Sequence, residues 1–427
     1  MRGYSRFSQG LALGAALSAA GFFLVSGSLK LKDFNSRTTA QILGRAHQQL
    51  AQDYVEPIDP KSLMHQGVAG MISSLEDPYS SFVGPDKMKI MEEEAEGELI
   101  GIGAIVAAGG TIRYPLGGSP AEDAGLRPGD TIRTVDGESV LGIPTRDLLD
   151  KVKGPQGTTV NLSVLREDGT LFETEIVRKS ILTGTISKIN LLDAEKGIGS
   201  LHLRSFARST PEELDRALAH LERKGILRGL ILDLRFNTGG LLESTIAVAS
   251  RFISDGPICS LLGRQGILTE RRANPDYTSH PEIPLVVILN NRSASGSEIL
   301  AGALRDRGAA VLVGEPSFGK GVYQKVQKYP NGEFSIKFTA GYYVTPSGRK
   351  LEGHMKDEEV GGLIPDIPVV PINPQHIKEW LYWDAPPSKW REDVARLFPN
   401  YIRQAPEDLA IATSLKILQK TIVNNDG

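Results

Sequence analysis

Residues 284–324 of this 427-residue chain read PLVVILNNRSASGSEILAGALRDRGAAVLVGEPSFGKGVYQ. The apolar runs 284–289 and 310–313 predict two buried strands, and residues 298–306 between them predict a helix. Two neighbouring strands joined through a helix are typical of a parallel sheet. The stretch therefore indicates an α/β fold.

The turn before this predicted helix carries Ser295, and Lys320 follows 25 positions later. A helix amino terminus favours an oxyanion and disfavours a charged lysine. If Lys320 is a general base, its pKa must fall by roughly three units from about 10.4. Burial between Phe318 and Val322 can supply that shift. Gln324, on the strand that follows, is a neutral amide that can orient the amine without recharging it.

A second strand-turn-helix unit precedes the first one. Its turn is Asn237-Thr-Gly-Gly240, between a predicted strand at 229–234 and a predicted helix at 241–252. A further strand at 198–203 and a helix at 210–221 come earlier. Because the carboxyl ends of parallel strands meet at one edge of a sheet, Gly239, Gly240 and Ser295 are expected to converge there.

Two other kinds of chemistry are open alternatives. Residues 314–320 match most of a phosphate-binding loop, but position 321 is Gly where Ser or Thr is required, and the residues after it resemble a strand. A histidine base is the other alternative, although none of the seven histidines stands in a recognisable motif. His202 is the one expected in a strand of the sheet. No histidine pair has metal-ligand spacing, so we expect no metal and no cofactor.

Residues 99–178 have a different texture, with short β-runs, tight turns and two short helices expected at 120–124 and 145–152. The run Gly118-Ser-Pro-Ala-Glu-Asp-Ala-Gly-Leu-Arg-Pro-Gly-Asp130 resembles the centre of a PDZ domain. On that resemblance, the segment that binds a peptide's free carboxyl end as an added strand comprises Leu99, Ile100, Gly101, Ile102, Gly103 and Ile105. A purely structural β-module is the alternative.

The amino terminus predicts export. Arg2 and Arg6 precede an uncharged apolar stretch at 11–25, and no clear cleavage site follows, so removal and retention as a membrane anchor both stay open. Helical periodicity dominates from Phe34 to Glu96. The formal net charge of −3 argues against a protein that coats nucleic acid. A single cysteine, Cys259, excludes an internal disulfide.

Taken together, the ordered motifs resemble those of the carboxy-terminal processing proteases, which are exported serine peptidases with an inserted PDZ domain. The motifs are residues 75–82, the PDZ core, 232–240, the block from Ser295 to Gln324, 345–348 and 364–366. The resemblance implies a mixed α+β, crotonase-like protease core. It also implies Ser295 as nucleophile, Lys320 as general base, Gln324 as its orienting partner, and an oxyanion hole from the amides of Gly239, Gly240 and Gly296.

Three positions depart from the family pattern. Gly296 stands where alanine is usual, and Tyr79 stands where many members have histidine. Lys153 stands where an arginine linked to PDZ gating is common, so we expect a regulatory role there. Substrates with free carboxyl ends are the implied partners, and an activating partner and a homo-oligomer stay open.

We therefore predict an exported serine endopeptidase, periplasmic or anchored by its amino-terminal segment, that cleaves proteins near the carboxyl end. Its expected regions are an export signal at 1–30, a helical region at 31–96, a PDZ domain at 97–179, a protease core at 180–372 and a helical tail at 373–427. The rival hypothesis is a catalytically inert PDZ adaptor of the cell envelope.

Overall fold

The computed structural model describes residues 36–96, 98–182, 184–266, 268–329, 333–354, 361–382, 386–398 and 407–426. The chain divides into two compact units, Met1–Leu75 and Glu76–Gly427. The predicted export segment lies outside the described residues. Across the described ranges, no helix is both long enough and apolar enough to span a bilayer.

The first unit is helical over its described part, as its periodicity predicts. Helix α2 spans Ser36–Asp53 and helix α3 spans Pro60–Ser73. The carboxylate of Asp59 accepts hydrogen bonds from the backbone N–H groups of Lys61 and Ser62, and Pro60 occupies the first helical position. Both features fix the start of α3, because they satisfy or remove amides that lack a partner within the helix.

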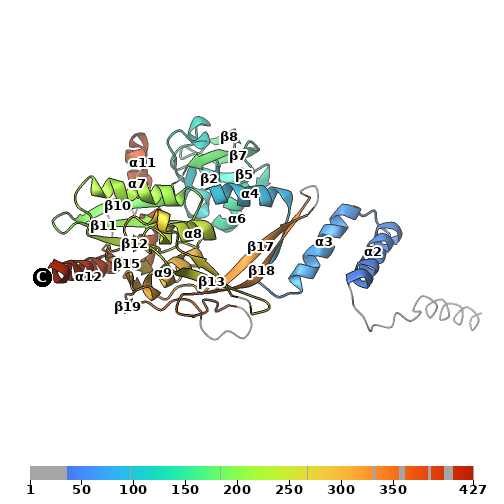
Figure 1. Ribbon diagram of the computed structural model, residues 1–427. Helices are drawn as coiled ribbons and strands as arrows, with labels where there is room; N and C mark the ends of the chain where they lie inside the picture. The colour runs from blue at the N-terminus through green and yellow to red at the C-terminus, as the bar shows by residue number, and fades with distance from the viewer. Residues whose placement is uncertain are drawn as a thin grey trace, which may run out of the picture. The chain divides into compact units, whose positions relative to one another are not determined.

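In the second unit, six strands of the described chain form the central sheet, in the order β10-β11-β12-β15-β16-β19 (Figure 1). All neighbouring pairs are parallel except β10 with β11, so the predicted parallel sheet is confirmed. The strands are β10 Ile186–Asp193, β11 Ile198–Leu203, β12 Gly229–Asp233, β15 Leu285–Leu289, β16 Ala310–Gly314 and β19 Ile367–Pro368.

Helices cover both faces of this sheet, because its central strands are apolar on both sides. Leu230 and Leu232 belong to a core shared with α7, α8 and α9, whereas Ile231 and Val286 pack with residues of α12. These helices are α7 Thr210–Glu222, α8 Leu242–Ala249, α9 Gly296–Asp306 and α12 Leu409–Asp426. The α9 helix begins two residues earlier than predicted, which places Ser295 immediately before its first turn.

A second sheet of the same unit is antiparallel. It follows the path β1-β18-β13-β14, with β17 also paired to β18. Its strands are β1 Ser81–Val83, β13 Pro257–Gly263, β14 Leu268–Arg272, β17 Val322–Lys328 and β18 Ser335–Val344. Because Lys320 leads into a strand rather than a helix, the phosphate-loop alternative lacks the helix amino terminus that it requires.

Helix α4, Pro85–Glu96, leads into the PDZ domain, where the two predicted short helices are present as α5, Pro120–Asp123, and α6, Thr145–Val152. The domain has its own apolar core, which includes Ile112, Leu126 and Leu162. Its strands are β2 Glu98–Gly101, β3 Ala104–Val106, β4 Ile112–Pro115, β5 Thr131–Val135, β6 Glu138–Ser139, β7 Thr159–Leu165, β8 Leu171–Val177 and β9 Lys179–Leu182.

The carboxy-terminal region contacts both the PDZ domain and the central sheet. Before α12 it forms α10, Pro374–Tyr382, and α11, Arg391–Leu397. Arg396 forms an ion pair with Glu167 of the PDZ domain, and Lys389 lies 2.6 Å from Glu122 of α5. The described parts of the tail predicted to be helical, 373–427, thus contain α10, α11 and α12.

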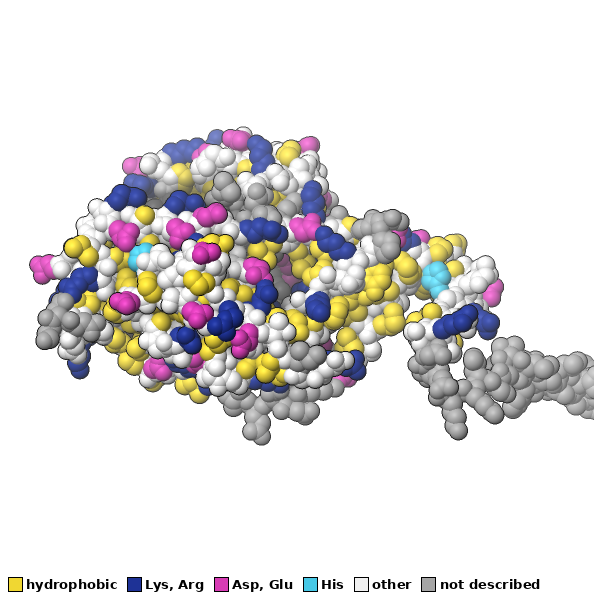
Figure 2. Space-filling view, in the orientation of Figure 1, with side chains coloured by type: hydrophobic (Ala, Val, Ile, Leu, Met, Phe, Trp, Pro, Cys, Tyr) yellow, Lys and Arg dark blue, Asp and Glu magenta, His cyan; other side chains and the backbone are white. Residues whose placement is uncertain are grey.

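The surface of the second unit mixes charges of both signs on the face that Figure 2 shows, where Lys and Arg side chains alternate with Asp and Glu. Exposed charges of the second unit also form ion pairs, as do Arg272 and Asp255 at 3.2 Å. Such exposed pairs contribute little to stability. Their mixture means that this face carries no extended field of one sign.

Candidate active site

Ser295 has an unusual backbone conformation, with φ 56° and ψ −112°. For a residue with a Cβ atom, this conformation costs of order 1–3 kcal/mol and persists only where the surroundings enforce it. Ser295 is half-buried at the amino end of α9, and its own N–H donates to the carboxylate of Glu298 at 2.8 Å. The strained turn therefore presents the hydroxyl where the helix dipole favours a negative oxygen.

The serine turn is bound to the loop that follows β12. The Ser293 hydroxyl donates to the carbonyl of Leu234 at 2.9 Å, and Ala294 N donates to the carbonyl of Asn237 at 3.0 Å. The Asn290 side chain accepts from the N–H of Phe236 at 2.9 Å. These bonds confirm that the two strand-turn-helix units converge at one edge of the sheet.

Gly239 and Gly240 approach their neighbours so closely that a side chain does not fit at either position. A Cβ atom on Gly239 would lie 2.8 Å from Gly296 N and 2.9 Å from Ser295 Cβ, and one on Gly240 would collide with the carbonyl of Phe206. Their φ angles are 102° and 150°. Glycine is therefore required at both positions, and the loop lies directly against Ser295.

The three amides of the predicted oxyanion hole are not equivalent. The N–H of Gly239 already donates to the Asn237 side chain at 2.8 Å. The N–H groups of Gly240 and Gly296 donate to nothing within the described ranges. Gly240 and Gly296 are therefore the amides that remain free to bind an oxyanion.

Lys320 is half-buried in the loop before β17, and its ammonium nitrogen lies 5.3 Å from the centre of the Tyr79 ring. Burial lowers the pKa of Lys320, against the opposing charges of Glu352 and Glu298. This direction is the one that the sequence argument requires, since only a neutral amine can accept a proton.

Glu298 connects the serine turn to the lysine loop, and sequence reasoning missed it. Its side chain is fully buried. One oxygen accepts from Ser317 Oγ at 2.5 Å and Gly319 N at 2.6 Å; the other accepts from Ser295 N at 2.8 Å and Lys320 N at 2.9 Å. Burial raises the pKa of Glu298, and the four hydrogen bonds oppose that shift. The signal available in the sequence was the capping-box spacing of Ser295 and Glu298 at the start of the helix.

Gln324 contacts Tyr79, one of the positions that depart from the family pattern. Its side-chain amide donates to the carbonyl of Tyr79, just after a β-bulge between Tyr323 and Gln324. Burial, followed by the charges of Glu352, Glu298 and Asp77, raises the pKa of Tyr79 to about 12. Tyr79 therefore contributes a neutral ring near Lys320 and a backbone acceptor for Gln324.

The predicted peptide-binding segment falls on two short strands of the PDZ domain. Leu99, Ile100 and Gly101 are in β2, which pairs with β9, and Ile105 is in β3, which in the described chain pairs only with β4. Ile102 and Gly103 lie between them, with Ile102 in the domain core. Ile105 is half-buried, so β3 offers both a free edge and a partly exposed side chain.

Lys153, the predicted regulatory residue, follows the last residue of α6 and is exposed. Its backbone N–H donates to Leu149 O at 2.9 Å. Its side chain forms no hydrogen bond or ion pair with the described parts of the chain. The end of α6 is instead held by Arg178, whose guanidinium donates to Val152 O at 2.9 Å.

His202 has a structural role and is not placed to act as a catalytic base. Its Nε2 atom lies 3.1 Å from the carbonyl of Arg235, and its Nδ1 atom lies 3.2 Å from the hydroxyl of Ser187. Because a carbonyl only accepts, Nε2 carries the proton. Burial lowers the pKa of His202. Both ring nitrogens are therefore engaged away from Ser295, and the described residues contain no group of three potential ligands suited to a metal ion.

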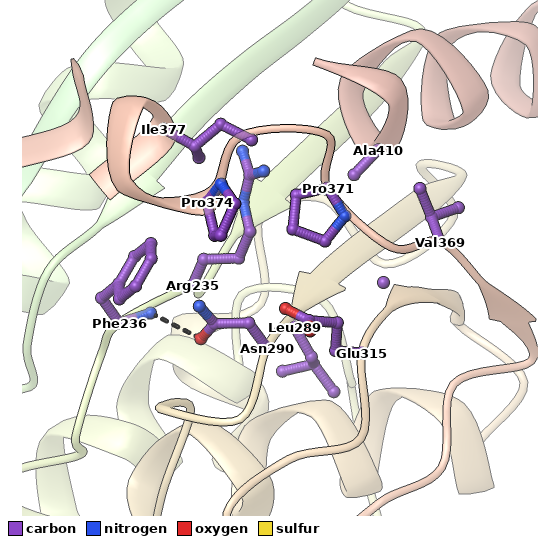
Figure 3. A pocket seen from close by; sticks show the side chains of 11 residues that line it. Arg235, Phe236, Leu289, Asn290, Glu315, Val369, Pro371, Pro374, Ile377 and Ala410 are labelled. Carbon is purple, nitrogen blue, oxygen red and sulfur yellow. Dashed lines mark hydrogen bonds between the residues drawn. The ribbon is translucent and has the colours of Figure 1, made fainter. Parts of the chain in front are cut away.

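A small, partly open cavity lies behind the loop that follows β12. Arg235, Phe236, Asn290, Glu315 and residues of the carboxy-terminal region line it, and neither Ser295 nor Lys320 is among the lining residues. Figure 3 shows the Phe236–Asn290 hydrogen bond at its edge and the Arg235 side chain extended along it. The cavity therefore borders the support of the serine turn rather than the turn itself.

Comparisons with known proteins agree with this architecture. Residues 197–369 match the model of peptidase family S41, residues 111–166 match a PDZ domain, and residues 27–87 match the "activating protease CtpB N-terminal domain". The carboxy-terminal processing protease CtpA of Bacillus subtilis (strain 168) is 31% identical over 84% of this chain and 77% of that protein.

Two further similarities extend the comparison. The carboxy-terminal-processing protease of Bartonella bacilliformis is 32% identical over 86% of this chain and 83% of that protein. Among solved structures, the photosystem II D1 C-terminal processing protease matches with 26% identity and a TM-score of 0.49, over 78% of this chain and 87% of that one.

The protein is thus a serine peptidase of family S41 that carries a PDZ domain. Within that family, the chain belongs to the carboxy-terminal processing proteases.

Proposed function

We propose that this protein is an endopeptidase that cleaves polypeptides near their carboxyl ends through an acyl-enzyme on Ser295. The observation that carries the proposal is the Glu298 carboxylate, which binds the backbone amides of both Ser295 and Lys320. A strained serine turn and a half-buried lysine with a lowered pKa are thereby held by one side chain. Such an arrangement suits nucleophilic catalysis with an amine base.

The chemistry follows from these positions. Neutral Lys320 removes the proton from Ser295 Oγ as that oxygen attacks the peptide carbonyl carbon. The resulting oxyanion is stabilised by the amides of Gly240 and Gly296, each worth about 3 kcal/mol in the transition state. Gly239 shapes this loop. Protonated Lys320 then donates to the leaving amine, and a water molecule attacks the acyl ester with Lys320 again as base.

Gln324 has a supporting role in this proposal. Its amide donates to the Tyr79 carbonyl. This bond joins β17, the strand after Lys320, to the segment that contains Tyr79. A neutral anchor fixes the geometry without adding a negative charge that would raise the pKa of Lys320.

Substrate capture is assigned to the PDZ domain. In the proposal a peptide adds to the free edge of β3, and its terminal carboxylate binds the backbone amides around Gly101 and Gly103. The half-buried Ile105 faces the last side chain of the peptide. The names of the relatives support this assignment, since they are carboxy-terminal processing proteases.

The decisive experiment measures cleavage and binding separately. The purified protein is incubated with an unstructured polypeptide that has an apolar carboxyl end, and Ser295→Ala is compared with the wild type. We expect Ser295→Ala to abolish cleavage and to retain peptide binding. Equal behaviour of the two proteins in the cleavage assay would support the rival hypothesis of an inert PDZ adaptor.

A second prediction concerns the substrate's terminal charge. Converting the terminal carboxylate of a peptide substrate to an amide should raise KM about tenfold or more, because a hydrogen-bonded charge contributes about 1.5–3 kcal/mol. Steady-state kinetics on paired peptides of identical sequence measure this effect. Equal KM values for the two peptides would refute carboxylate recognition.

Location, regulation and assembly are also proposals. Arg2, Arg6 and the apolar stretch at 11–25 support export and periplasmic residence, either with or without an anchor. The match of residues 27–87 to a domain named for an activating protease is compatible with control by a partner or by a second copy. In the proposal, Lys153, at the exposed end of α6, has a regulatory role that is linked to movement of the PDZ domain.

A further inference from the structure

We infer that Asp408, at the start of the carboxy-terminal helix α12, is a positioning residue for the loop that carries Gly239 and Gly240. The contact runs through Arg235, the residue that precedes this loop. The inference rests on the proposed function, because it assigns importance to amides that are proposed to bind the oxyanion.

Arg235 is clamped between two carboxylates. Its guanidinium donates to Asp233 through Nε at 2.9 Å and to Asp408 through Nη1 at 3.1 Å and Nη2 at 2.6 Å. The side chains are only 5%, 3% and 12% exposed for Arg235, Asp233 and Asp408. Figure 3 shows the Arg235 side chain extended toward the segment that contains Ala410. A buried, bidentate pair of this kind fixes geometry more strictly than an exposed ion pair does.

The backbone of Arg235 is held as firmly as its side chain. Its N–H donates to the Asp233 carboxylate at 3.0 Å, and its carbonyl accepts from His202 Nε2 at 3.1 Å. His202 belongs to β11, Asp233 to β12, and Asp408 immediately precedes α12. The start of the loop is therefore fixed by three separate parts of the fold.

From Arg235 the loop reaches the site in a few residues, each constrained in turn. Phe236 has a positive φ of 65°, and its N–H is bound to Asn290 at 2.9 Å. The Asn237 side chain donates to Leu203 O and accepts from Gly239 N, both within 2.9 Å. A displacement at Arg235 is thus transmitted to Gly239 and Gly240 rather than absorbed, because packed loops of this kind shift as units.

Asp408 has a second role that the experiment must separate. It caps α12, since its carboxylate accepts from Ala410 N at 3.1 Å. Asparagine caps helices as well as aspartate does, but it lacks the charge that pairs with Arg235. D408N therefore weakens the ion pair and keeps the cap, whereas D408E keeps the charge.

The test compares kcat and KM for D408N, D408E and D215N in the full-length protein. Asp215, whose side chain is 46% exposed, forms a bidentate pair with the buried Arg251 at 2.9 and 2.7 Å, and D215N is the control for the loss of an Arg–Asp pair elsewhere in the protein. We expect D408N to lower kcat about tenfold with KM changed less than twofold, as for a misplaced transition-state contact. The kcat of D408E should recover at least half of the loss seen in D408N. Both kcat and KM of D215N should stay within twofold of the wild-type values.

Thermal unfolding of the same variants shows whether all are folded at the assay temperature. A kcat for folded D408N equal to that of the wild type would overturn the inference, as would an equal loss in D215N. These outcomes are separate from failure of the proposed function, which would appear as cleavage by Ser295→Ala.

Discussion

Replacing Lys320 by methionine is expected to lower kcat by about 10³-fold, within the range that general bases contribute. Methionine fills a similar volume and accepts burial, but its thioether cannot take the proton of Ser295 Oγ at neutral pH. KM should change little, because Lys320 acts on the serine rather than on peptide binding. Single-turnover cleavage of an unstructured polypeptide measures the loss. Lys337→Met is the matched control, since burial also lowers the pKa of Lys337 on the neighbouring strand β18.

The pH dependence provides an independent check of the same residue. Burial lowers the pKa of Lys320, and the base is active only when neutral. The value of kcat/KM in the wild type should therefore rise with pH up to that lowered pKa and level off above it. The rising limb should be absent from the residual activity of Lys320→Met. A bell centred near neutrality, or a Lys320→Met variant as active as Lys337→Met, would contradict an amine base.

Four strands of the central sheet, β11, β12, β15 and β16, could be predicted from sequence because each is a short and mainly apolar run, whereas β10 and β19 lack that pattern. Periodicity of this kind depends on local burial on both faces, which the residues themselves encode. The predicted strands 198–203 and 310–313 agree with β11 and β16 to within one residue. Helix ends were less predictable. The helix expected at 298–306 begins two residues earlier, at Gly296, because Ser295 and Glu298 form a capping box that the prediction did not use.

The candidate site could be predicted only for residues of distinctive chemistry that lie close together in the sequence. Ser295 and Lys320 stand out because a small-residue turn and a lysine between glycines are unusual. Tyr79 does not, since it lies 241 positions from Lys320 and reaches the site only through the pairing of β1 with β18. The ion pair between Arg235 and Asp408 could not be predicted from the sequence for the same reason. Long-range contacts depend on the packing of whole elements, which single-sequence patterns do not specify.

Glu298→Ala is expected to lower kcat/KM by about 10²-fold and to destabilise the fold by about 3 kcal/mol, because one buried and two partly buried backbone N–H groups would lose their acceptor. These belong to Ser295, Gly319 and Lys320. Without the carboxylate, the amides of Ser295 and Lys320 lose the acceptor that they share, and only looser ties such as the bond from Phe318 N to Ser293 O at 2.9 Å remain. The hydroxyl and the amine would then be held in a less fixed geometry. Kinetics at a temperature well below the unfolding midpoint separate the catalytic loss from the loss of stability.

Glu298→Gln should lower kcat less than Glu298→Ala does. This variant helps to distinguish a role of Glu298 in positioning the site from a role in stability alone. A glutamine can place its NH₂ group beside Ser317 Oγ, whose hydroxyl rotates to accept, and can leave its oxygen on the amides of Ser295 and Lys320. Only Gly319 N then lacks an acceptor, so we expect about a tenfold loss of kcat. Ser317→Ala removes a hydrogen bond to the same carboxylate but leaves the bonds from Ser295 N and Lys320 N in place. It should therefore lower the unfolding temperature but leave kcat nearly unchanged. If Glu298 merely supported the fold, activity in all three variants would follow the unfolding temperature, and Ser317→Ala would lie on the same line as Glu298→Gln.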